Sequence, residues 1–429
     1  MQASLRPIPS LTGLRFVAAF CVFITHSILA IFPVAGSAGM VGYVALWKLA
    51  GIGMPLFFVL SGFVIHYNYR AAVSDHGARG KVNFFVARFA RLYPMFLFVL
   101  AYDLISRPSQ LAGSGLEALP YYLLMVQPWV YKVMDGREFI YQYGVMPQAA
   151  WSISTEWFFY CAYPFLCLGL VRLKTPRRTL LTMAGLCVLA VALLCTIAFG
   201  SDAITSFAYA HVPRPTNWDV SDQQSPVRWL VNFSPYSRIL EFCCGCLVAE
   251  FHLQTRNRPV GAREQAFGRW LTPLAIGVLL AGYGVFEVVY NTWLIPGPYV
   301  TAFAECFGLA PPIGLLIFCC ARYDNVVVRL LSRPTVLILG EASYSIYLLH
   351  PMVIHVMHWQ AIPVKTGAAL IADLVLFATT IGCTFGLALV TWRIVEVPAR
   401  RWLRRKLTLP IARPPAGAAA PGEQAAPAG

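Results

Sequence analysis

The chain has 429 residues, of which 58% are hydrophobic and only 12% are charged. These proportions exclude an ordinary soluble protein, because so much apolar surface needs a lipid environment. The formal net charge of +14 does not indicate nucleic-acid binding, because the basic residues lie between apolar segments instead of forming one tail or stripe.

Ten apolar segments follow one another between Leu11 and Trp392, and a helix needs roughly 20 mostly apolar residues to cross a bilayer. They predict an all-α fold, a polytopic membrane helical bundle of about ten transmembrane helices, in one integral membrane domain over residues 1–405. The first segment lacks a small-residue cleavage pattern, so we expect it to stay attached. The predicted spans are 11–30, 50–68, 92–106, 151–170, 180–199, 237–252, 270–290, 300–320, 336–357 and 367–392.

The distribution of Lys and Arg predicts how the bundle is oriented. Ten spans place both termini on one side of the membrane, and 25 of the 33 basic residues fall in intervals on that side. Because cytoplasmic loops are enriched in Lys and Arg, we expect both termini to be cytoplasmic. The Ala- and Pro-rich residues 406–429 are expected to form a disordered cytoplasmic tail.

The twelve cysteines lie in or beside apolar segments, which is typical of small buried hydrophobic side chains. Cys243, Cys244 and Cys246 form the densest group. Neighbouring residues on a helix point in different directions, and no histidine is suitably spaced nearby. We therefore expect no metal site and no permanently bound cofactor.

Two ionisable residues share one face of the first predicted span. Arg15 and His26 are 11 residues apart, which places them within about 20° of the same face and about 16 Å apart along the axis. An ionisable side chain inside a bilayer faces the bundle interior or a watery cavity. His26 is therefore a candidate general base for acyl transfer, and a hydrogen bond to a neighbouring helix is the structural alternative. Arg15 suits an anionic group of a cytoplasmic donor, or snorkelling to the interface.

A second basic group lies at the cytoplasmic entrance of the third predicted span. Arg88 and Arg91 are spaced i, i+3, which suits recognition of the phosphates of a nucleotide-bearing cofactor. Anchoring by the positive-inside rule explains them equally well. In the preceding span, Ser61 and Gly62 are small residues that allow close helix approach or a lined channel.

Three polar or aromatic residues begin the fourth predicted span near its outer end: Trp151, Ser152 and Glu156. A carboxylate at such a position does not face lipid. Glu156 could orient His26, bind a sugar hydroxyl or pair with a cation, and the sequence does not choose among these roles. Trp151 could stack on a sugar or lie in the interfacial aromatic belt.

Polar residues also interrupt the sixth and ninth predicted spans. Arg238 and Glu241 are spaced i, i+3 and predict a structural ion pair within the membrane. Ser343, Tyr347 and His350 share a helix face and present three hydrogen-bonding groups to the interior. Tyr347 and His350 are thus candidate substrate-binding residues.

Seven motifs, in this order along about residues 10–402, resemble those of the membrane acyltransferase-3 family. They are Leu11-Thr-Gly-Leu-Arg15 with His26, Leu56-Phe-Phe-Val-Leu-Ser-Gly-Phe63, Arg88-Phe-Ala-Arg91-Leu-Tyr-Pro94, Trp151-Ser-Ile-Ser-Thr-Glu156, Arg238-Ile-Leu-Glu241-Phe, Ser343-Tyr-Ser-Ile-Tyr-Leu-Leu-His350 and Glu396-Val-Pro398.

The resemblance implies a membrane O-acyltransferase of the bacterial inner membrane that moves an acyl group, usually acetyl, from acyl-CoA to a hydroxyl. It implies that His26 is catalytic and that Arg15, Arg88 and Arg91 bind the donor. We expect Glu156 to be a second catalytic residue that acts beside the acceptor, and the expected acceptor-binding residues are Trp151, Ser152, Tyr347 and His350. The expected partners are acyl-CoA, a surface glycan or lipid-linked sugar, membrane lipids and polysaccharide-assembly proteins, and no nucleic acid.

Two positions depart from the family pattern. Thr12 and Pro55 stand where many members have Asp, so any role of those carboxylates is absent here. Other functions also fit the sequence: acylation of a small secreted molecule such as an antibiotic, transport or flipping of glycan precursors, and a passive scaffold for polysaccharide export. A transporter would also use intramembrane charges, but inverted repeats that would favour it are not evident.

Overall fold

The structure is a computed structural model that describes residues 6–31, 49–111, 113–141, 147–216, 224–291, 306–358 and 367–410. Within these ranges the regular structure is almost entirely helical, as the apolar segments predict. The exception is a short antiparallel hairpin of β1 (Val133–Met134) and β2 (Arg137–Glu138), in which Val133 pairs with Glu138.

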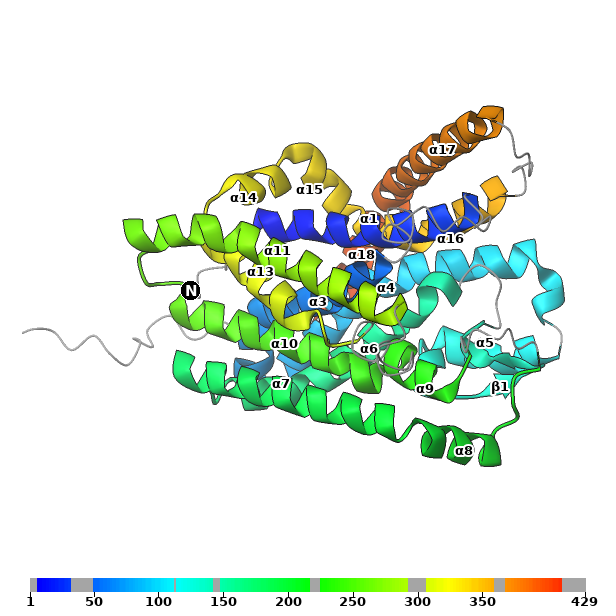
Figure 1. Ribbon diagram of the computed structural model, residues 1–429, viewed down its shortest axis with the longest axis horizontal. Coiled ribbons are helices and arrows are strands. Elements are labelled where there is room, and N and C mark those ends of the chain that lie inside the picture. Colours follow the sequence, from blue (N-terminus) through cyan, green and yellow to red (C-terminus); the bar gives the residue numbers. More distant parts are fainter. Residues whose placement is uncertain are drawn as a thin grey trace, which may run out of the picture.

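Several of the helices, including α1, α7, α10 and α11, run roughly along the long axis of the molecule (Figure 1). The α-helices are α1 (Pro9–Ile31), α3 (Ala50–Asp75), α4 (Gly77–Ser106), α5 (Ser114–Leu123), α6 (Pro147–Leu170), α7 (Pro176–Phe199), α8 (Ser201–His211), α9 (Pro226–Arg228), α10 (Pro235–Thr255), α11 (Ala262–Asn291), α13 (Ala310–Arg322), α14 (Val326–Leu331), α15 (Pro334–Glu341), α16 (Ser343–His358), α17 (Gly367–Thr391) and α18 (Val397–Leu407). The short 3₁₀ and π-helical segments are η1 (Pro108–Leu111), η2 (Gln127–Trp129), η3 (Phe139–Tyr141), η4 (Trp229–Phe233) and η5 (Trp392–Glu396).

Six helical stretches among the described residues are long and apolar enough to cross a membrane. A seventh is obtained if the bent pair α15 and α16 counts as one span. The chain is therefore a multi-pass membrane protein, while the number ten stays a prediction. The six stretches are Pro9–Ile28, Ala50–Asp75, Gly77–Ser106, Pro176–Phe199, Ala262–Phe286 and Ile371–Leu407.

The other predicted spans also correspond to helices, with two differences. The spans at 151–170 and 237–252 lie within α6 and α10, and 300–320 is described only from residue 306, where α13 forms its second half. The single helix expected at 336–357 is wrong, because α15 and α16 meet there at 67°. The bend lets α15 pack on α1 while α16 packs on both α1 and α17.

Helices α3 and α10 cross closely through two glycines. A Cβ at Gly62 would lie 2.0 Å from the carbonyl oxygen of Phe242, and one at Gly245 would lie 1.9 Å from that of Val59. Such backbone contact is possible only without side chains. The predicted role of Gly62 in close helix approach is therefore confirmed, and the neighbouring Ser61 faces a cavity described below.

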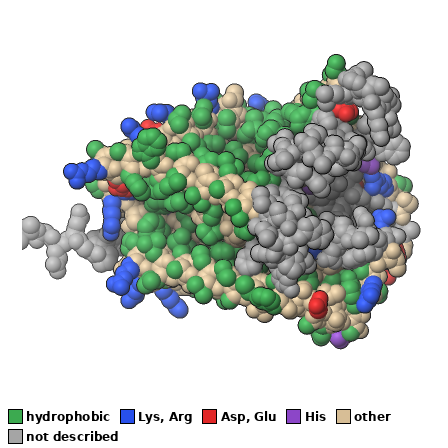
Figure 2. Space-filling model, viewed as in Figure 1, with side chains coloured by type: hydrophobic (Ala, Val, Ile, Leu, Met, Phe, Trp, Pro, Cys, Tyr) green, Lys and Arg blue, Asp and Glu red, His purple; other side chains and the backbone are tan. Residues whose placement is uncertain are grey.

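The surface separates apolar and basic regions. Hydrophobic side chains cover much of the visible middle of the molecule, whereas Lys and Arg gather near the end that carries the N-terminus (Figure 2). The links that join α6 to α7 and α10 to α11 contribute the exposed basic residues Arg172, Lys174, Arg256 and Arg258. This asymmetry is the one expected of a positive-inside membrane protein.

At the opposite end, described residues between α4 and α6 pack against described residues between α7 and α10, and the two segments together are called the cap (Figure 1). Tyr131 donates a 2.8 Å hydrogen bond to the carbonyl of Gln224, and the indole of Trp229 donates to the carbonyl of Pro128 at 3.1 Å. The cap buries Glu138, whose two carboxyl oxygens make no hydrogen bond in the described part of the chain. Burial raises the pKa of Glu138 well above its usual range, and the nearby Arg228 only partly opposes this.

Candidate active site

A cavity of about 700 Å³, measured with its opening, lies between α1, α3, α4, α6 and α16. It brings together six of the nine candidate catalytic, donor-binding and acceptor-binding residues, although they are up to 332 residues apart. Its wall is otherwise mostly apolar, with four tyrosine and serine side chains from α3, α6 and α16. The six are Arg15, Arg88, Arg91, Ser152, Glu156 and Tyr347.

Three guanidinium groups line this cavity. Arg15 on α1 is close enough to Arg88 and Arg91 on α4 for their charges to interact. Arg88 donates a 2.6 Å hydrogen bond to the Tyr69 hydroxyl, yet its Nε is buried without a hydrogen-bond partner in the described structure. Arg91 is paired only at 3.8 Å with Glu396. The arrangement concentrates positive charge and leaves N–H donors for an anionic ligand.

Glu156 places a carboxylate on the same cavity. Its Oε1 accepts hydrogen bonds from the hydroxyls of Ser61 at 2.6 Å and Tyr160 at 2.5 Å. The sequence left three roles open for Glu156. The structure does not show the first of them, orientation of His26, because the ring of His26 contacts His350. Glu156 instead joins α3 to α6 and faces the arginine-lined part of the cavity.

Ser152 and Tyr347 meet across the cavity wall. Their hydroxyl oxygens are 2.6 Å apart, and the Ser152 hydroxyl lies 3.0 Å from the carbonyl of Ala149. The Tyr347 hydroxyl lies 3.5 Å from the same carbonyl, so either hydroxyl can donate in the bond between Ser152 and Tyr347. This bond joins α16 to α6 at Tyr347, which lines the cavity and is three residues before His350.

His26 and His350 form a pair just beyond Tyr347. Nδ1 of His26 lies 2.7 Å from Nε2 of His350, and the two rings are within 8° of parallel. His350 is fully buried, and its Nδ1 lies 2.6 Å from the backbone carbonyl oxygen of Tyr347. Neither histidine is among the residues that line the cavity, but Tyr347 lines it and lies beside His350, with 5.8 Å between the ring centres.

The remaining predicted residues lie behind the wall. Trp151 is only 8% exposed and packs edge-on against Phe58 and Phe233, so the structure places it in the packing next to the cavity instead of on its surface. Arg238 lies over the Trp151 ring and forms the predicted ion pair with Glu241, with 2.9 Å between Nη1 and Oε1.

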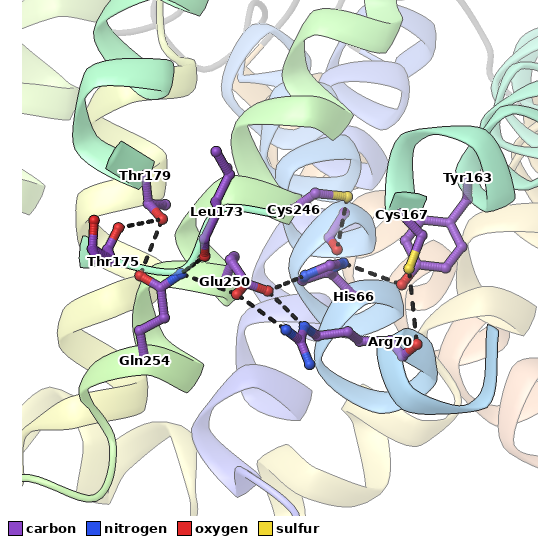
Figure 3. Close-up of polar contacts among 11 residues, drawn as sticks. His66, Arg70, Tyr163, Cys167, Leu173, Thr175, Thr179, Cys246, Glu250 and Gln254 are labelled. Atoms are coloured by element: carbon purple, nitrogen blue, oxygen red, sulfur yellow. Dashed lines mark hydrogen bonds and ion pairs between the residues drawn. The ribbon is translucent and has the colours of Figure 1, made fainter. Parts of the chain in front are cut away.

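The sequence interpretation missed a second buried polar network, which joins α3, α6 and α10 (Figure 3). His66 lies between the Tyr163 hydroxyl at 3.1 Å and Glu250 at 2.8 Å. Glu250 also accepts from Arg70 at 2.8 Å and from Gln254 at 3.0 Å. His66 and Glu250 fall inside two predicted spans, so the rule that ionisable residues within a membrane face partners could have found them.

The structure also describes the cysteines and the groups that could bind a metal ion. All twelve cysteines belong to the described residues and are free thiols, and six of them are buried. In the ranges that the structure describes, His, Cys, Asp and Glu form no group of three that could hold a metal ion.

Comparison with known proteins identifies the family. The sequence profile of the family described as "Acyltransferase domain" (acyltransferase-3) matches residues 8–393. The chain belongs to the acyltransferase-3 family. Its cavity and histidine pair are therefore the candidate active site of a membrane acyltransferase.

Curated relatives of this acyltransferase carry related names. Acyltransferase MdmB of Streptomyces mycarofaciens is 31% identical over 362 residues, which cover 82% of this chain and 80% of MdmB. O-acetyltransferase OatA of Staphylococcus aureus is 23% identical over 92% of this chain, and peptidoglycan O-acetyltransferase OatA of Listeria monocytogenes is 21% identical over 92%. The chain spans 58% and 56% of the lengths of these two OatA proteins. No solved structure matches.

Proposed function

We propose that this acyltransferase moves an acyl group, most simply acetyl, from acyl-CoA on the cytoplasmic side to a hydroxyl of a surface glycan or lipid-linked sugar. One observation carries the proposal: a single cavity holds three guanidinium groups and is lined by Tyr347, which lies beside the His26–His350 pair. A candidate donor site and a candidate base are thus linked through Tyr347, which lines the cavity and lies beside His350.

The donor is proposed from the chemistry of the arginines. The phosphates of a nucleotide-bearing thioester carry several negative charges, and Arg15, Arg88 and Arg91 offer planar, permanently charged donors. The buried, unpaired Nε of Arg88 is the kind of group that a phosphate oxygen would satisfy. The pantetheine arm would then run along the apolar wall formed by residues such as Phe57 and Leu60.

The reaction follows from placing the thioester near Tyr347. The acceptor hydroxyl loses its proton to His26 as its oxygen bonds to the carbonyl carbon of the thioester. The C–S bond then breaks, and the proton held by His26 passes to the departing thiolate. The products are an ester and a free thiol, so atoms and charges balance. Glu156, Ser152 and Tyr347 are proposed to position the reacting groups from the cavity wall.

The acceptor is proposed to enter from the capped end of the bundle. The name of the Listeria relative refers to peptidoglycan, a glycan polymer, and the OatA names refer to O-acetylation. We extend this acceptor class to the present chain and place the protein in the bacterial inner membrane, with both termini cytoplasmic. Polysaccharide-assembly proteins are proposed partners, and the acyl-CoA is a co-substrate that is not retained.

The proposal is tested in cells by mass spectrometry of surface glycans. Three strains are compared: one with the wild-type gene, one with the gene deleted, and one with His26→Ala restored at equal membrane abundance. Loss of O-acyl groups in both altered strains is expected. Unchanged glycans in the deletion strain would overturn the glycan acceptor, and loss in the deletion strain alone would overturn the role of His26.

A further inference from the structure

We propose that His350 is a positioning residue, which together with Pro351 fixes the proton of His26 on Nδ1 and so leaves Nε2 of His26 as the basic nitrogen. The inference rests on the proposed function, in which His26 accepts the acceptor's proton. It assigns His350 a different role from the substrate binding expected from the sequence.

The first step is a consequence of Pro351 inside α16. In an α-helix the N–H of residue i bonds to the carbonyl of residue i−4, and proline has no N–H. The carbonyl of Tyr347 is four residues before Pro351, so it loses its usual helical donor. Nδ1 of His350 lies 2.6 Å from that oxygen and takes the place of the missing N–H.

The second step fixes the tautomer of His350. A carbonyl oxygen can only accept a hydrogen bond, so the proton of this contact is on Nδ1 of His350. The side chain is fully buried, packs edge-on against Phe23 and lies beside the Tyr347 ring. A second proton would place an unpaired charge in this apolar packing, which is strongly unfavourable. Nε2 of His350 therefore carries a lone pair.

The third step passes the constraint to His26. Nε2 of His350 can only accept, and it lies 2.7 Å from Nδ1 of His26, so Nδ1 of His26 carries the proton. Nε2 of His26 is then unprotonated in the resting state. When it takes a proton from the acceptor hydroxyl, the bond to His350 becomes charge-assisted and stabilises the imidazolium. The Tyr347 carbonyl, which Pro351 leaves without its helical donor, thus orients His26 through His350.

Two substitutions of His350 distinguish its contact with His26 from its contact with the Tyr347 carbonyl. His350→Gln places an amide oxygen near the position of Nε2 and can keep accepting from His26. His350→Asn places an amide nitrogen near the position of Nδ1, which keeps the bond to the Tyr347 carbonyl but loses His26. Because a positioned general base contributes about 10²–10⁴-fold, we expect His350→Asn to lower kcat about 100-fold or more. His350→Gln should retain most of kcat, and the KM for acyl-CoA should be unchanged in both.

Pro351→Ala provides a variant that favours a regular helix. It returns an N–H to position 351, which competes with His350 for the Tyr347 carbonyl. Loss of this one hydrogen bond should lower kcat about 3- to 10-fold. It keeps the inference testable if His350→Asn does not fold, as judged by its thermal unfolding in detergent. Full kcat in either folded variant, or a loss confined to KM, would overturn the positioning role.

A spectroscopic measurement tests the tautomer without using activity. In protein labelled with ¹⁵N-histidine, the ring shifts of His26, identified by comparison with His26→Gln, should show a protonated Nδ1 and an unprotonated Nε2. In Pro351→Ala this population should fall. A proton on Nε2 of His26 in the wild type would overturn the inference. Because this readout needs no substrate, absence of acyl transfer would instead count against the proposed function alone.

Discussion

The guanidinium of Arg88 donates a 2.6 Å hydrogen bond to the hydroxyl of Tyr69 and lies over the same ring, with 4.6 Å between Cζ and the ring centre. A neutral phenol holds this side chain in place without cancelling its charge. One face of the guanidinium is thereby fixed, and its buried Nε remains for a ligand. The charge on α4 is thus organised for binding an anion.

Arg88→Lys tests this organisation. Lysine keeps the charge but loses the planar donor, and a hydrogen bond to a charged group contributes about 1.5–3 kcal/mol. We expect the KM for acyl-CoA to rise about 10- to 100-fold, with a smaller change in kcat. Arg404→Lys is the matched control, since Arg404 is exposed on α18 and does not line the cavity. Equal KM values for the two variants would argue against a phosphate contact at Arg88.

Gly62→Ala tests the crossing of α3 and α10. The added methyl group would lie 2.0 Å from the Phe242 carbonyl oxygen, so the helices must separate. Overpacking of this kind destabilises by about 1–3 kcal/mol, and thermal unfolding in detergent should show a lower Tm. Gly277→Ala on α11 is the control, because a Cβ there meets nothing within 4 Å. It should leave Tm unchanged or raise it. If the Tm of Gly277→Ala fell as much as that of Gly62→Ala, close packing at Gly62 would not explain the loss of stability.

The sequence predicted which candidate residues share a face of one helix. Helical periodicity correctly grouped Arg88 with Arg91, Ser152 with Glu156, and Arg238 with Glu241, because each pair lies on one helix. The same rule also placed Arg15 and Tyr347 toward the interior, where both line the cavity.

Contacts between helices could not be derived in the same way. The His26–His350 pair depends on how α1 packs against α16, and the break between α15 and α16 helps to set that packing. Trp151 shows the opposite case, since an aromatic residue near an outer helix end suits a sugar site, yet its ring is enclosed by Phe58 and Phe233. Helical periodicity predicts which side chains share a helix face, and only the packing of the helices determines which residues those side chains contact.

Glu250→Ala tests the buried network of Figure 3. The change removes the acceptor shared by His66, Arg70 and Gln254. Leaving a buried hydrogen-bonding partner such as His66 unsatisfied destabilises by about 1–3 kcal/mol, so Tm should fall. Glu117→Ala is the control, because Glu117 is 70% exposed and its partner Lys132 is 40% exposed, and such surface pairs contribute about 0–1 kcal/mol. Similar Tm values for the two variants would show that the network does not stabilise the fold.

Glu138→Gln tests the buried carboxyl group of the outer cap. Because burial raises the pKa of Glu138, the folded protein holds this proton more tightly than the unfolded chain does. Its contribution to stability is present at low pH and is lost as pH rises from about 4.3, the usual value for Glu, toward the raised pKa. The Gln variant has no proton to lose, so its Tm should exceed that of the wild type increasingly as pH rises.

A control for this pH dependence is Glu117→Gln in the same outer segment. The Glu117 side chain is 70% exposed, so its replacement should shift Tm little and equally at each pH. A Tm difference between Glu138→Gln and wild type that does not grow with pH would contradict the account of the buried carboxyl group.

The central claim is that acyl-CoA is the donor and His26 the base, and purified protein in vesicles tests it most directly. Labelled acetyl-CoA is supplied with a glycan acceptor, and thiol release and ester formation are measured for wild type and His26→Gln at equal protein abundance. The account predicts one thiol for each ester with the wild type, and a fall in kcat of about 100-fold or more with His26→Gln. Ester formation that His26→Gln leaves unchanged, or wild-type protein that takes no acetyl group from acetyl-CoA, would contradict it.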